Sequence, residues 1–117
     1  MNWNQLKTLN QLDSIIEESK ENAIVIFKHS TRCSISSTSL NRLERNWKQE
    51  EVGNTKPYYL DLISYRDLSN AIVDTFGVEH QSPQVLIIEN GKAVYNQSHL
   101  AIDYNTIKEA LLNPIKN

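Results

Sequence analysis

Cys33 is the only cysteine in this chain of 117 residues, and polar side chains surround it. It follows a continuously apolar run at residues 23–27 and begins a segment with helical spacing, so we expect it between a buried strand and a helix. The unpaired N–H groups in the first turn of a helix stabilise an anion placed there. A thiolate is the nucleophile of disulfide exchange. The position of Cys33 therefore predicts a thiol that attacks S–S bonds.

The neighbours of Cys33 strengthen this interpretation. Three basic side chains lie within five residues upstream, namely Lys28, His29 and Arg32. Their positive potential would favour the thiolate further. The alternative is that a single cysteine is merely a small buried apolar residue. The strand-to-helix position and the polar residues that follow, Ser34, Ser36 and Ser37, favour the reactive thiol.

Ser36 stands where dithiol oxidoreductases have their second cysteine, in the motif Cys33-Ser34-Ile35-Ser36. Without a second thiol, Cys33 can accept a group as a mixed disulfide, but an external thiol must release it. The Ser36 hydroxyl could donate a hydrogen bond to the thiolate and stabilise it. The alternative role is that of an ordinary serine in the first turn of a helix.

The apolar periodicity predicts the elements that must position this thiol. Helical spacing predicts helices over residues 10–20, 33–49 and 64–76, and a last helix that starts near Asp103. Apolar and β-branched runs predict strands at residues 23–27, 58–62, 84–88 and 92–95. The dipeptide Asn90-Gly91 between the last two is typical of a hairpin turn. Caps are expected at Asn10, at Ser64 with Asp67, and at Gly77.

This order, α-β-α-β-α-β-β-α, predicts parallel early strands and an antiparallel closing hairpin. The result is an α/β fold, a mixed four-stranded sheet with helices on both faces, which is the thioredoxin-like arrangement. A chain of this length accommodates one domain, residues 1–117.

Ser82-Pro83 precedes the third predicted strand. Only about 5–6% of X-Pro bonds in folded proteins are cis, but in this topology we expect a cis bond here. It would present the Ser82 backbone beside the sulfur, able to pair with an extended thiol substrate. The alternative is a trans proline at the start of a strand. His29 and His80 flank the two segments and could line the site or move protons, or be ordinary loop histidines.

The composition argues against several classes of function. Lys and Arg number 12 and Asp and Glu 14, for a formal charge of −2, which disfavours nucleic acid or an anionic membrane as the main partner. No apolar stretch approaches the roughly 20 residues of a membrane span, and the first residues lack the pattern of a signal peptide, so we expect a cytoplasmic protein. One Cys and three scattered His show no spacing for a structural metal site.

Residues 27–36, Phe-Lys-His-Ser-Thr-Arg-Cys-Ser-Ile-Ser, closely resemble the active-site stretch of the YtxJ-like monothiol bacilliredoxins. The similarity extends over nearly the whole chain, including Ser82-Pro83 with Gln84 and the Asn90-Gly91 hairpin. One departure is Ser34, because this family commonly has proline after the cysteine. Proline in the first turn of a helix pre-sets its backbone, so Ser34 is expected to alter the rigidity of this turn.

The resemblance implies a thioredoxin-like fold and a defined reaction. Cys33 would attack the disulfide of an S-bacillithiolated protein and carry the bacillithiol group, and a second bacillithiol molecule would regenerate the thiol. Bacillithiol would then be a co-substrate, with no bound cofactor. Lys28, Arg32 or His80 could meet its carboxylates, beside Ser82-Pro83.

Two other functions remain open at this stage. One is a glutaredoxin-like monothiol protein that uses another thiol or an iron–sulfur cluster, although the cluster-binding members carry Cys-Gly-Phe-Ser, which this motif does not match. The other is a non-catalytic adaptor or stress protein on the same scaffold, since fold alone does not establish activity.

Overall fold

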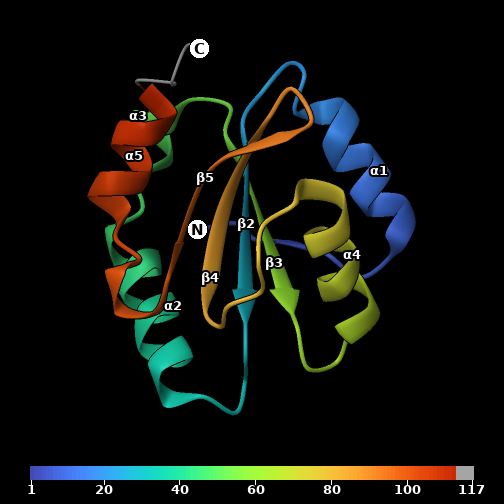
Figure 1. Ribbon diagram of the computed structural model, residues 1–117. Coiled ribbons are helices and arrows are strands. Elements are labelled where there is room, and N and C mark those ends of the chain that lie inside the picture. The colour runs from blue at the N-terminus through green and yellow to red at the C-terminus, as the bar shows by residue number, and fades with distance from the viewer. Residues whose placement is uncertain (113–117) are drawn as a thin grey trace.

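The computed structural model describes residues 1–112, which form a five-stranded mixed sheet in the order β1-β3-β2-β4-β5. The strands are β1 (Asn4–Gln5), β2 (Ile24–His29), β3 (Lys56–Asp61), β4 (Gln84–Glu89) and β5 (Lys92–Ser98). The helices are α1 (Leu9–Glu18), α2 (Ser34–Asn46), α3 (Gln49–Val52), α4 (Arg66–Phe76) and α5 (Tyr104–Leu112), with a 3-10 turn, η1, at His99–Ala101. Helices α1 and α4 cover one face of the sheet, and α2, α3 and α5 cover the other (Figure 1).

Strand β2 lies at the centre of this sheet. It pairs in parallel with β3 and antiparallel with β4, and β4 pairs antiparallel with β5. All six residues of β2 are buried, as a strand covered on both faces requires. Its side chains alternate between two cores, with Ile24 and Ile26 on the α1/α4 side and Val25 and Phe27 on the α2/α5 side.

The predicted mixed sheet with helices on both faces is confirmed, but the predicted number of strands is wrong. The additional strand is β1, whose two residues pair in parallel with Tyr58 and Tyr59 of β3. A pairing of two residues is too short to produce a recognisable alternation of apolar and polar positions.

The predicted long helix after Cys33 is in fact two helices. Helix α2 ends before Trp47, which adopts an extended backbone with ψ 126°. The Trp47 ring packs edge-on against Tyr104, with 5.5 Å between centroids, and its indole N–H donates to Gln49. The short helix α3 then begins at Gln49, because the buried indole has redirected the chain.

Two predicted N-terminal caps are also wrong. Thr8 caps α1 through a reciprocal capping box with Gln11, two residues before the predicted Asn10 cap. Tyr65 precedes α4, and the Ser64 hydroxyl donates to the Asp61 carboxylate at 3.0 Å instead of capping the helix.

The predicted turns that need a positive φ are confirmed. Gly77 ends α4 in the left-handed conformation, with φ 68°. In the β4–β5 hairpin, Asn90 and Gly91 have φ values of 52° and 75°, which matches the turn that closes a two-residue hairpin.

Candidate active site

Cys33 is the N-cap residue of α2, with an extended backbone at φ −113° and ψ 121°. Its N–H donates to the carbonyl of Ser30 at 3.2 Å, and its own carbonyl accepts the N–H of Ser37 at 3.1 Å. The thiol is free and half-buried. The structure therefore places the sulfur at the first turn of a 13-residue helix, directly after the central strand.

The Ser82-Pro83 peptide bond is cis, as expected, and precedes β4. Gln84, the first residue of β4, pairs with Lys28 near the end of β2, so Ser82-Pro83 lies at the edge of the sheet where the chain leaves β2 for Cys33 (Figure 1). The Pro83 carbonyl accepts the N–H of His99 at 3.0 Å. The His99 carbonyl in turn accepts the Ser39 hydroxyl of α2 at 2.9 Å. Hydrogen bonds thus link the proline segment to the helix that begins at Cys33.

Ser36 is fully buried and connects the strand, the turn and the helix. Its Oγ accepts the N–H of Ser30 at 3.0 Å and lies 2.7 Å from Nδ1 of His29. With one bond accepted, the hydroxyl proton is free to be donated to Nδ1 of a neutral imidazole. Among the hydrogen bonds of residues 1–112, those of the Ser36 side chain go to Ser30 and His29, and none goes to Cys33.

His29 belongs to β2 and not to the predicted polar turn, and it is 5% exposed on the α2/α5 side of the sheet. Its ring lies among aromatic side chains, 5.6 Å from Tyr59 and 6.3 Å from Phe27 between centroids. Burial lowers the pKa of His29, while the Asp61 and Glu44 carboxylates oppose the shift. The imidazole under the turn is therefore held neutral near pH 7 and serves as a hydrogen-bond partner for Ser36.

Trp3 completes this aromatic group. Its ring centroid lies 6.0 Å from that of Phe27 and 6.1 Å from that of Tyr59, and its indole N–H donates to Glu44 of α2 at 2.8 Å. The sequence interpretation of His29 missed this setting. The signal in the sequence was the strand pattern of residues 23–27. It extends to His29 if Lys28 is accepted as a buried strand residue.

Lys28 points to the opposite face, because neighbouring residues of a strand alternate. It is fully buried between Leu60 and Gln84, its cross-strand neighbours, and its Nζ has no hydrogen-bond partner. Burial lowers the pKa of Lys28 to about 8. Ser82 Oγ and Gln84 Oε1 are also buried without a partner, although the Gln84 amide donates to the Glu79 carbonyl at 2.9 Å. The structure thus separates Lys28 from His29 by the thickness of the sheet.

The remaining predicted residues lie at the surface. Arg32, Ser34 and His80 are exposed. His80 lines a cavity of about 100 Å³ together with Leu62, Arg66, Ser69 and Asn70. Burial and the positive charges of Lys28 and Arg66 lower the pKa of His80. His80 therefore groups with Lys28 on the α4 side and not with His29.

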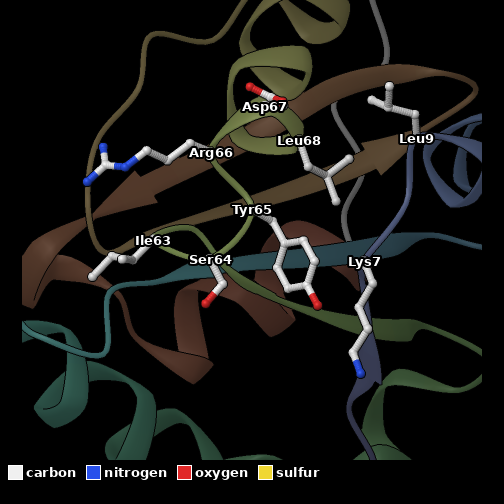
Figure 2. Close-up of a pocket in the computed structure, with 8 residues that line it drawn as sticks. All are labelled: Lys7, Leu9, Ile63, Ser64, Tyr65, Arg66, Asp67 and Leu68. Atoms are coloured by element: carbon white, nitrogen blue, oxygen red, sulfur yellow. The ribbon is translucent and has the colours of Figure 1, made fainter.

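A larger cavity, about 480 Å³, lies between the turn that precedes α1 and the start of α4 (Figure 2). Its lining consists of Lys7, Leu9, Ile63, Ser64, Tyr65, Arg66, Asp67 and Leu68, and does not include Cys33. Figure 2 shows the Lys7 amine and the Arg66 guanidinium pointing away from each other, so these two cations do not converge on one ligand. The thiol therefore lies outside this cavity.

Over residues 1–112 the structure contains no group of three or more His, Cys, Asp or Glu side chains that could hold a metal ion. None of the helices in the same part of the chain has the length and apolar character needed to cross a membrane.

Known structures identify the fold of this chain. Thioredoxin from Trypanosoma brucei brucei superposes with a TM-score of 0.71 at 19% identity, covering 99% of this chain and 93% of that one. Thioredoxin from Malassezia sympodialis gives a TM-score of 0.74 at 13% identity, covering 95% and 89%. At these identities the likeness establishes the fold, which is that of thioredoxin.

Two further comparisons identify the family. A solved structure described as "a putative oxidoreductase with a thioredoxin fold" has a TM-score of 0.78 and 30% identity, covering 91% of this chain and 90% of that one. The family model of monothiol bacilliredoxin BrxC matches residues 4–107. The chain belongs to the monothiol bacilliredoxin family, which confirms the resemblance of its active-site stretch.

Removal of the Ser36 hydroxyl should destabilise the protein. Ser36→Ala leaves the Ser30 N–H and the His29 ring without their partner in a buried site, so we expect the free energy of unfolding to fall by about 1–3 kcal/mol. Urea denaturation at pH 7 measures this. Ser34→Ala, an exposed serine two residues away, is the control and should change the value by less than about 0.5 kcal/mol. Equal effects of the two substitutions would contradict the role given to Ser36.

Replacement of the buried ammonium should have the opposite effect. The folded-state pKa of Lys28, about 8, lies below the ordinary value of 10.5, so below pH 8 the folded protein buries a charge. Because one pKa unit corresponds to about 1.4 kcal/mol, Lys28→Met should raise the free energy of unfolding at pH 7 by up to about 3 kcal/mol. The stability gained by Lys28→Met should shrink as the pH rises from 8 to 10.5. In this range Lys28 of the folded wild type has lost its proton while the unfolded chain still holds it, so the wild type becomes more stable. Denaturation across this range measures it, with exposed Lys92→Met as control, and a gain independent of pH would contradict the assignment.

Proposed function

We propose that this protein removes bacillithiol from S-bacillithiolated proteins, with Cys33 as the nucleophile that carries the mixed disulfide. One observation carries the proposal: the only thiol of a bacilliredoxin-family chain stands half-buried at the start of α2, with a serine and not a cysteine three residues later. The helix N-terminus supplies N–H groups that stabilise a thiolate.

The reaction takes place in two exchanges. The Cys33 thiolate attacks the bacillithiol sulfur of the modified protein, so that a new S–S bond joins Cys33 to bacillithiol while the protein's cysteine leaves as a thiolate and takes up a proton. A second bacillithiol thiolate then attacks the sulfur of the bound bacillithiol. Oxidised bacillithiol leaves, and Cys33 is restored as a thiolate.

The surrounding residues would take positioning and binding roles. The Ser82 backbone, adjoining Pro83, would pair with the extended substrate, and the bonds of Ser36 to His29 and to the turn would hold Cys33 in place. Arg32 and Ser34 flank the thiol at the surface and would face the modified protein. Because Ser36 replaces a second thiol, the return of Cys33 to its free form would depend on bacillithiol from solution.

Mass spectrometry of the intact protein tests the first exchange. Incubation with a bacillithiolated peptide should add the mass of one bacillithiol to the wild-type chain and nothing to Cys33→Ser, and excess bacillithiol should then remove the adduct. An adduct formed equally fast from glutathionylated peptide would favour a glutaredoxin-like protein with another thiol. The absence of an adduct from any disulfide would favour a non-catalytic adaptor and reject the proposal.

A second cysteine at position 36 should convert the one-thiol site into a two-thiol site. Residues three apart in the first helical turn lie on the same side. Oxidation of Ser36→Cys with diamide should therefore form a disulfide between positions 33 and 36. The variant should then have no free thiol, and its mass should fall by that of two hydrogens. Thr38→Cys, an exposed position five residues after Cys33 and on another side of α2, is the matched control and should keep its thiols free of each other. Two free thiols in oxidised Ser36→Cys would show that the two positions do not face each other.

A further inference from the structure

Three basic side chains gather on the α4 side of the sheet, next to Ser82-Pro83. Arg66, at the start of α4, and His80, two residues before Ser82, line the same cavity of about 100 Å³. Lys28 lies buried on this face of β2, close enough for its charge to act on His80. Figure 2 shows the Arg66 side chain extending away from Lys7 and from Asp67.

These cations have no acidic partner within residues 1–112. The ion pairs found there join Lys20 to Glu17, Lys56 to Glu18 and Lys108 to Glu51. Neither Lys28 nor Arg66 takes part in one, and Lys28 Nζ has no hydrogen-bond partner at all. Only positive neighbours, Lys28 and Arg66, act on His80. A buried ammonium without a counter-charge is costly, and an anion bound at this face would offset that cost.

The cavity, about 100 Å³, has room for a small anionic group such as a carboxylate. Arg66 and His80 can donate hydrogen bonds to such a group, and Ser69 and Asn70 line the same space. The buried Lys28, whose charge acts on His80, adds positive potential.

We propose that the cavity between Arg66 and His80, backed by Lys28, binds a carboxylate of the small thiol that is exchanged at Cys33. This assignment rests on the proposed function and names the part of the thiol that is recognised. His80 leads directly into the cis-proline segment, so a thiol held there by its carboxylate would present its sulfur towards the start of α2.

The rate of adduct formation at Cys33 tests this proposal with two probes, oxidised bacillithiol, which carries carboxylates, and hydroxyethyl disulfide, which is uncharged. Loss of one charge-assisted hydrogen bond corresponds to about a tenfold change, so Arg66→Gln should slow the reaction with oxidised bacillithiol roughly five- to tenfold. The reaction with hydroxyethyl disulfide should change less than about twofold. Added salt should slow the bacillithiol reaction more in the wild type than in Arg66→Gln.

Two further variants complete the experiment. Lys28→Met removes the enclosed charge without touching the cavity wall and should slow only the reaction of the anionic disulfide, by about two- to threefold. Lys92→Gln, which removes an exposed charge from the β4–β5 hairpin, should change neither rate. A bacillithiol adduct that forms equally fast in Arg66→Gln, or equal slowing of both probes, would overturn the carboxylate site alone. No bacillithiol adduct on the wild type, with hydroxyethyl disulfide still reacting, would overturn the proposed function as well.

Discussion

The burial of β2 on both faces is the constraint on which the thiol site depends. Because β2 is paired on both edges and covered by helices on both sides, every one of its residues is packed, including the two polar residues at its end. The directions of the Lys28 and His29 side chains are therefore fixed by the strand. Strand alternation sends Lys28 under α4 and His29 under α2, and the turn to Cys33 starts from that fixed point.

The two polar residues at the end of β2 are accommodated by different means. His29 is neutral and its Nδ1 is matched to the Ser36 hydroxyl, so its burial is compensated by a hydrogen bond. Lys28 has no such partner, so the free-energy cost of burying its ammonium is not offset. Of these two residues of β2, His29 has its polar group compensated and holds the turn, whereas the uncompensated Lys28 is the one to which we assign a part in binding an anion.

Much of this arrangement could be predicted from the sequence. The continuous apolar run of β2, the stripe of α4 and the Asn90-Gly91 turn are local patterns, and each gave the correct element. The position of Cys33 at the start of α2 followed from the first of them and from the helical spacing after Cys33. The two-residue β1 and the break at Trp47 could not be predicted, because the first depends on pairing with a distant strand and the second on the packing of Trp47 against Tyr104.

The link between α2 and the segment that follows β5 has a consequence for how a substrate is bound. The Arg42 guanidinium donates to the carbonyls of Leu100 and Ile102, and Ser39 donates to His99, which itself binds the Pro83 carbonyl. The helix that carries the thiol and the segment that would pair with the disulfide are thus joined into one preorganised surface. Because this surface is already ordered, most of the conformational entropy lost on binding is that of the substrate chain. More of the binding free energy is then available to align the three sulfur atoms of the exchange.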